Sequence, residues 1–316
     1  MAFFGSHVKP AVAAMLLLAL PGASVAQDAA MASASPALWR VHSATSTVYL
    51  FGSLHILPPG YAWRTPTIDG AMNASDLFIF EVPVDEDALK EEKEFIIQNG
   101  ILPRQQSLIN LLTQGEFQIY RTVLRRAGLR PNQFERYRPW LASIMLGLAY
   151  LHRDELTTLK GADDEVMDYA RAQGKPLLYL ESMRQQMELL TAGDDGAQLK
   201  SLKRLIAGLG SARRHEQELR DLWSSGDTKR FTAVLESYFD GRADAKDWFI
   251  DSRNRTWLTA FRQFLSRPGG TTMITVGSAH VGGTQGLLTL LCQEGYAVER
   301  VGSRGEAAEN SCGPES

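Results

Sequence analysis

The sequence lacks several features that would assign it to a familiar class of protein. It contains only two cysteines, Cys292 and Cys312, and a formal net charge of −3 with both signs interspersed. Two cysteines cannot complete a zinc site of four cysteines, or one of three cysteines and a histidine. Without a basic excess, nucleic acid is not an expected partner. After residue 26 no apolar run approaches the roughly 20 residues of a membrane helix, so we expect no transmembrane segment in the mature chain.

Several well-known catalytic signatures are also missing. The chain has no Gly-x-Ser-x-Gly elbow, His-Glu-x-x-His helix, Walker loop or Gly-x-Gly-x-x-Gly fingerprint. These absences argue against nucleophile-elbow hydrolases, zincin peptidases, P-loop nucleotidases and dinucleotide-binding dehydrogenases. Any reaction chemistry must therefore come from another arrangement of residues.

The first residues are typical of a secretory signal peptide. The apolar run 11–20 follows His7 and Lys9, and small residues end at Ala26, where we expect cleavage. The protein is therefore predicted to be exported, either periplasmic or secreted. In that oxidising location we expect Cys292 and Cys312 to form a disulfide.

The rest of the chain predicts a flexible leader over residues 27–37 and a single α/β domain over residues 38–316. Short apolar runs alternate with helical segments, which favours a mostly parallel central sheet covered by helices. Two stretches, at about 85–159 and 184–265, have helical periodicity and are expected to form insertions that cap the sheet. The expected strands are Leu38–Val41, Thr47–Gly52, Leu77–Glu81, Leu177–Glu181, Met273–Val276 and Tyr296–Val298.

The most informative pattern is a repeated Gly-Ser-x-His. It occurs at residues 52–55 and 277–280, each time directly after a short apolar run. We expect each glycine to allow a sharp turn, so that His55 and His280 lie at the carboxyl edge of the sheet, where open α/β sheets place their ligands. The two imidazoles are then predicted to converge on one site.

An acidic residue, Glu81, ends another apolar run and is predicted to join the two histidines. Two imidazoles and a carboxylate are a common ligand set for a catalytic divalent metal that keeps an open position for water. We therefore predict that His55, His280 and Glu81 bind Mn, Co or Zn, with Glu81 as a ligand or as the base acting on metal-bound water. Affinity alone does not select the metal.

Further residues are candidates for supporting roles at the same site. Asp163 is expected to fix an imidazole or to cap the helix that follows it. Glu181 is expected to act similarly or to interact with a helix N-terminus. Arg253 and Asn254 are predicted to orient a carboxylate or a substrate carbonyl. Ser53 and Ser278 lie two residues before the histidines, and either is a weaker candidate for a nucleophile.

These motifs together resemble the TraB/PrgY/GumN family, whose eukaryotic relatives include the Tiki proteins. The resemblance is carried by residues 52–58, Phe80-Glu81, Gly161-Ala162-Asp163 with Gly174-Lys175-Pro176 and Leu180-Glu181, Arg253-Asn254, and residues 276–283 with Gly286-Leu287-Leu288. It implies a metal-dependent hydrolase fold, and metalloprotease activity with Mn or Co in the Tiki branch. Under the resemblance, His55, Glu81 and His280 match the proposed metal-site residues.

The function expected from the sequence is an exported metal-dependent hydrolase acting on a peptide or small acyl substrate. Two alternatives use the same histidines or the same site without turnover. One is a metal- or haem-binding protein of the cell envelope, and the other is a regulatory protein that sequesters a peptide.

Overall fold

The computed structural model describes residues 34–152, 159–302, 307–310 and 312. The predicted signal peptide and nearly all of the predicted leader lie outside the described residues. By its internal contacts the chain forms two compact units. Within the described part, one unit comprises residues 82–152, 159 and 181–217, and the other comprises residues 34–81, 160–180, 218–302, 307–310 and 312. The single domain predicted over residues 38–316 stays a prediction.

The first unit is helical. Its elements are α3 (Glu86–Asn99), η1 (Leu108–Leu111), α4 (Gln114–Arg126), α5 (Pro139–His152), α7 (Met183–Leu190) and the first part of α8 (Asp195–Ser224). Side chains fix the helix starts: Asp85 accepts a hydrogen bond from the Ala88 amide, and Thr113 forms a capping box with Glu116. Such caps satisfy amides that have no partner inside the helix. The helices expected over 85–159 are thus present in the described residues.

The second unit is built on a seven-stranded mixed sheet in the order β4-β3-β5-β2-β1-β6-β7. The pairs β4–β3, β3–β5 and β5–β2 are parallel, and the pairs from β2 to β7 are antiparallel. This confirms the predicted α/β class. The strands are β1 (Leu38–His42), β2 (Thr47–Ser53), β3 (Leu77–Phe80), β4 (Leu177–Tyr179), β5 (Thr271–Gly277), β6 (Ala297–Val301) and β7 (Ala307–Asn310).

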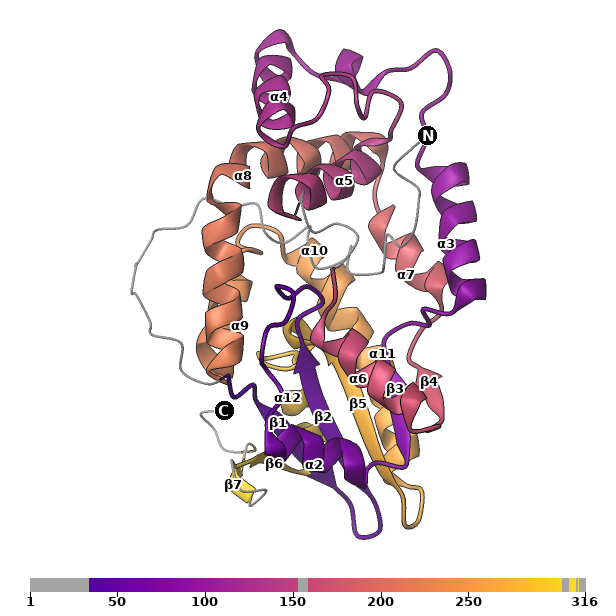
Figure 1. The fold of residues 1–316 in the computed structure, drawn as a ribbon, viewed down its shortest axis with the longest axis vertical. Coiled ribbons are helices and arrows are strands. Elements are labelled where there is room, and N and C mark those ends of the chain that lie inside the picture. The colour runs from indigo at the N-terminus through magenta and orange to yellow at the C-terminus, as the bar shows by residue number, and fades with distance from the viewer. Residues whose placement is uncertain (1–33, 153–158, 303–306, 311, 313–316) are drawn as a thin grey trace. The chain divides into compact units, whose positions relative to one another are not determined.

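Helices lie on both faces of this sheet (Figure 1). On one face, α11 (Ser252–Leu265) and α12 (Leu287–Gln293) bury side chains such as Phe261 and Leu291 against alternate strand residues, including Leu50 and Ile274. On the other face, α2 (Pro66–Ala74) and α6 (Ala162–Ala172) contact β5 and β3. The alternation follows from the two-residue period of a strand.

The remaining helical segments complete the second unit. They are the end of α8, α9 (Thr228–Ser237), α10 (Ala243–Lys246), the π-helical turn η2 (Asp247–Asp251) and the 3-10 turn η3 (Ser278–His280). Helices over residues 184–265 were expected, but part of that segment, from residue 218 onward, belongs to the unit that contains the sheet. Within the described ranges, no helix has the length and apolar character that a membrane span requires.

The edges of the sheet differ from the prediction in detail. Strand β7 was not predicted, because residues 307–310 include Glu309 and Asn310 and form no apolar run. Strand β4 ends at Tyr179, so Glu181 lies beyond it. The predicted disulfide is present between Cys292, in α12, and Cys312, with the two Cα atoms 5.4 Å apart.

Candidate functional site

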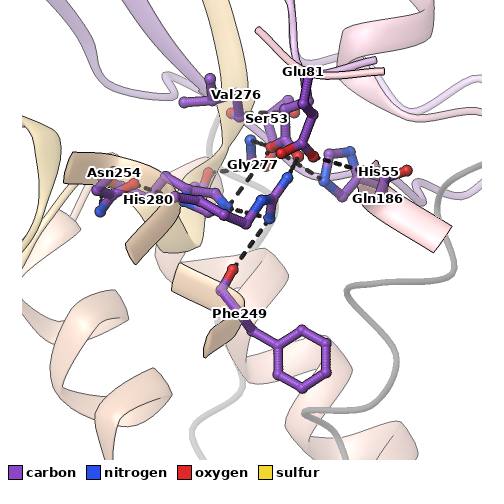
Figure 2. A network of polar contacts seen from close by, with 12 residues as sticks. Ser53, His55, Glu81, Gln186, Phe249, Asn254, Val276, Gly277 and His280 are labelled. Atoms are coloured by element: carbon purple, nitrogen blue, oxygen red, sulfur yellow. Dashed lines mark hydrogen bonds and ion pairs between the residues drawn. The ribbon is translucent and has the colours of Figure 1, made fainter. Parts of the chain in front are cut away.

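The predicted site residues of the second unit come together at the carboxyl ends of three adjacent strands. Glu81 directly follows β3, His55 lies two residues after β2, and His280 lies three residues after β5. Because β3, β5 and β2 are parallel neighbours, these ends meet at one edge of the sheet. Figure 2 shows His55, Glu81, Gly277 and His280 gathered there. The predicted convergence of the two imidazoles is therefore observed.

Glu81 lies at the centre of this group and is fully engaged. Its Oε1 accepts a hydrogen bond of 2.6 Å from the Gly277 amide, and its Oε2 pairs with Nη2 of Arg253 at 2.6 Å. Both partners of the ion pair are buried, each with a side chain 8% exposed. Burial alone would raise the pKa of Glu81, but Arg253 and the other polar neighbours hold that pKa well below its usual range. Glu81 is thus ionised and weakly basic.

His55 is oriented by Asp163. Its Nδ1 lies 3.1 Å from Oδ2 of Asp163, and its Nε2 lies 3.9 Å from Oε1 of Glu81. Burial disfavours the charged imidazolium, yet the charge and hydrogen bond of Asp163, with the charge of Glu81, outweigh it and raise the pKa of His55 to about 9. The resting form at neutral pH is therefore the imidazolium.

The start of α6 explains why Asp163 is available for this contact. The N-cap residue of α6 is Gly161, whose amide donates to Oδ2 of Asp164. Asp164 therefore supplies the capping interaction, and Asp163 supplies the partner of His55. The two roles left open by the sequence are divided between neighbouring aspartates.

His280 is held in one neutral form. The Asn254 Nδ2 donates to the carbonyl oxygens of His280 and Gln285, at 3.2 and 2.7 Å, so its Oδ1 faces Nδ1 of His280 at 2.7 Å as an acceptor. His280 consequently carries its proton on Nδ1, and the lone pair of Nε2 accepts a hydrogen bond of 3.0 Å from Nη1 of Arg253. Burial, with the adjacent guanidinium, lowers the pKa of His280 to about 3.

Arg253 bonds to both Glu81 and His280, and the Phe249 carbonyl and the Trp257 ring also contact it. Its Nη1 also donates to the Phe249 carbonyl at 3.1 Å, in the π-helical turn that leads into α11. Its guanidinium lies over the Trp257 ring, 4.5 Å from the centroid. The same indole contacts the His280 ring with centroids 4.5 Å apart. A π-helical turn at such a position is common near functional residues.

The glycines of the repeated motif act by allowing close approach. The expected sharp turn is wrong for Gly277, because its φ of −57° is accessible to any residue, and Gly52 lies inside β2. A Cβ at Gly277 would lie 2.9 Å from Nε2 of His55 and 3.3 Å from Oε1 of Glu81. Glycine is needed there because the site lies directly against the backbone.

The other predicted site residues have different surroundings. Ser53 Oγ donates to the Val276 carbonyl at 3.3 Å, and Ser278 Oγ donates to the Ser53 carbonyl at 3.0 Å. Both serines thus connect the ends of β2 and β5. Glu181 belongs to the first unit, where its carboxylate accepts a hydrogen bond of 3.5 Å from Gln186.

The predicted metal ligands do not fit a metal ion in this arrangement. The Nε2 lone pair of His280, the only one on its neutral ring, accepts a hydrogen bond from Arg253. Glu81 is already paired with the Arg253 guanidinium. His55 would have to lose a proton before binding a cation. Among the described residues, no group of three or more histidine, cysteine or acidic side chains is placed to hold a metal. Metal binding therefore stays a prediction, and we derive no reaction step through a metal.

Two contributors to the site were not identified from the sequence. The Gly277 amide binds Glu81, and Trp257 supports both Arg253 and His280. Backbone donors leave no trace in side-chain patterns. Trp257 could have been identified from its spacing, since it lies four residues after Arg253 on α11 and so shares a helix face with it.

Comparisons with known proteins identify the chain at the level of its family. Neither curated proteins nor solved structures gave a match. The model of the TraB/PrgY/gumN family matches residues 37–300. This range contains every residue of the site at the strand ends. The resemblance noted in the sequence is therefore confirmed, and the chain belongs to the TraB/PrgY/gumN family.

Proposed function

We propose that this protein is a hydrolase of peptide or related acyl bonds, with His55 as the group that moves the proton. The observation that carries the proposal is the position of His55 between Asp163 and Glu81. A carboxylate on Nδ1 fixes the imidazole tautomer, and Nε2 is directed toward the centre of the site. This is the arrangement that a general acid–base requires.

The proposed reaction uses the neutral form of His55, which forms when the resting imidazolium loses its Nε2 proton and which becomes more abundant as pH rises toward about 9. Its Nε2 accepts a proton from a water molecule while the water oxygen bonds to the carbonyl carbon of the substrate and the carbonyl π electrons move to oxygen. When the tetrahedral species collapses, the C–N or C–O bond breaks, and Nε2 returns the proton to the leaving nitrogen or oxygen. The products are a carboxylic acid and an amine or alcohol.

Glu81 and Arg253 have a different role in this proposal. Arg253 and the Gly277 amide help to hold the pKa of Glu81 well below its usual range, so Glu81 is a weak base for accepting the proton from water. With Asp163, it stabilises the imidazolium that forms on His55. Arg253 keeps Glu81 ionised, and both serve as positioning residues.

Two finer predictions from the sequence belong to the same proposal. For hydrolysis to depend on Mn, Co or Zn bound by His280, Arg253 must first leave Nε2 of His280. Adding or chelating the metal and measuring hydrolysis tests this dependence. Export is supported by the disulfide, which is usual outside the cytoplasm. N-terminal sequencing of the protein recovered from its native location tests cleavage after Ala26.

The activity itself is tested with chromogenic peptides and esters. Wild-type protein is compared with His55→Gln, Asp163→Asn and a matched control, His42→Gln, at the end of β1 where the side chain is 40% exposed. We expect hydrolysis by the wild type and the control, and a large loss in the other two. Undiminished hydrolysis by a His55→Ala, His280→Ala double variant contradicts the proposal.

A further inference from the structure

We infer that Arg253 is the resident cation of this site, in the position that a divalent ion bound by His280 and Glu81 would need. The wild-type chain then binds no ion through His280, and removing the guanidinium creates a site of two histidines and one carboxylate. The inference concerns which cation the site holds, and it stands whether or not the site hydrolyses a substrate.

The first argument is the direction of the lone pair on His280. Neutral imidazole has one lone pair, and Asn254 places it on Nε2 by accepting the proton of Nδ1. An ion bound to Nε2 would lie about 2.1 Å along that lone pair. Nη1 of Arg253 already lies 3.0 Å away as a hydrogen-bond donor to this atom. One lone pair cannot serve both, so ion and guanidinium exclude each other.

The second argument is the spacing of the three predicted ligands. Oε1 of Glu81 lies 3.9 Å from Nε2 of His55 and 3.9 Å from Nε2 of His280. Ligand atoms at about 2.1 Å from one ion lie roughly 3 to 3.5 Å apart. Each histidine nitrogen would therefore need to approach Glu81 by under about 1 Å to share an ion with it. Glu81 lies close to each histidine, and the guanidinium occupies the lone pair of His280 that an ion would use.

The third argument is that Arg253 is firmly held. It pairs with Glu81, donates to Phe249 and His280, and lies over Trp257. Its side chain is 8% exposed. A planar guanidinium with several fixed donors suits such a buried site better than a flexible ammonium would. Displacing it would leave a buried positive charge without its carboxylate, which is strongly unfavourable.

The test is metal binding by the purified protein with its disulfide intact, without any substrate. Wild type, Arg253→Met and the matched control Arg255→Met, whose arginine is 47% exposed on the same helix, are each incubated with Zn²⁺, Mn²⁺ or Co²⁺ and desalted. Bound metal is measured by elemental mass spectrometry, and Co²⁺ coordination by its visible spectrum. Circular dichroism confirms that each variant is folded.

We expect close to one ion per chain in the Arg253→Met variant. The double variant that combines Arg253→Met with His280→Ala should lose this ion. Neither the wild type nor Arg255→Met should bind an ion that depends on His280. Stoichiometric metal in the wild type that disappears in His280→Ala would overturn the inference. A folded Arg253→Met chain that binds no ion would also overturn it. If Arg253→Met does not fold, wild type against His280→Ala decides alone, by the presence or absence of a His280-dependent ion.

Discussion

Strands β2 and β5 run side by side and end in the same four-residue pattern, yet their histidines differ in charge. His55 faces Asp163 and Glu81, and its pKa is raised to about 9. Burial, together with the adjacent Arg253 guanidinium, lowers the pKa of His280 to about 3. At neutral pH the first is a cation and the second is neutral. The shared Gly-Ser-x-His pattern therefore sets the place of a histidine, while burial and residues from α6 and α11 set its chemistry.

The largest expected difference between the two strand ends is catalytic. We predict that His55→Gln lowers kcat/KM by about 10²- to 10⁴-fold, because it removes the proposed general acid–base. The measurement is steady-state hydrolysis of the substrate identified in the peptide and ester panel. His42→Gln, which also replaces a histidine at a strand end, is expected to retain activity. Equal activities for the two variants would place the chemistry elsewhere.

Removing the positive charge of Arg253, which contacts Glu81 and His280, is predicted to lower the free energy of unfolding. Arg253→Met leaves Glu81 buried without its ion-pair partner, so we expect the free energy of unfolding to fall by about 3–5 kcal/mol. Urea denaturation monitored by circular dichroism measures it. Arg255→Met breaks only an exposed pair with Asp247 and is expected to cost less than about 1 kcal/mol. Similar small losses in both variants would show that the buried pair is unimportant.

The raised pKa of His55 predicts a dependence of stability on pH. The folded state holds the proton more tightly than the unfolded state, so this stabilisation is full below about pH 6.5 and is lost as pH rises through about 9. A shift from 6.5 to about 9 corresponds to roughly 3 kcal/mol. Urea denaturation between pH 6 and 10 should show this decline in the wild type and a smaller one in His55→Gln. Parallel curves for the two proteins would refute the raised pKa.

The two motif glycines provide the smallest and most local comparison. A Cβ at Gly277 would meet Nε2 of His55, whereas a Cβ at Gly52 would meet Cγ2 of Val281 at 2.9 Å. We predict that Gly277→Ala displaces the His55 ring and lowers kcat roughly 10-fold at a stability cost of about 1 kcal/mol. Gly52→Ala should cost about 1–3 kcal/mol by overpacking, with a smaller effect on kcat in the folded fraction. The reverse ranking in kcat would contradict the site geometry.

Much of the fold could be predicted from the sequence, and so could the convergence of His55, Glu81 and His280 at one edge of the sheet. The apolar runs before Gly52, Glu81 and Gly277 identified the strands, and parallel strands bring their carboxyl ends to one edge. The family was carried by the motifs at those ends. Element boundaries were less accurate, since β5 extends over Thr271–Gly277 and β4 is only Leu177–Tyr179.

Which side chains contact which could not be predicted in the same way, and the sequence left two roles open for Asp163. Asp163 lies 108 positions from His55, and Arg253 lies 27 positions from His280. Their contacts depend on how α6 and α11 pack against the sheet, which local sequence does not specify. Arg253 was expected to orient a carboxylate, and it does pair with Glu81, but its contact with His280 was not foreseen. That contact makes Arg253, Glu81 and His280 members of one buried hydrogen-bonded network.

The most direct test of this account is an NMR titration of the histidine side-chain nitrogens in the intact protein, assigned with His55→Gln and His280→Gln. We predict that His55 carries protons on both ring nitrogens at pH 7 and loses one near pH 9, while His280 carries a proton on Nδ1 alone at pH 7 and stays neutral on acidification to about pH 5. Two histidines that titrate together near pH 6.5 would contradict it.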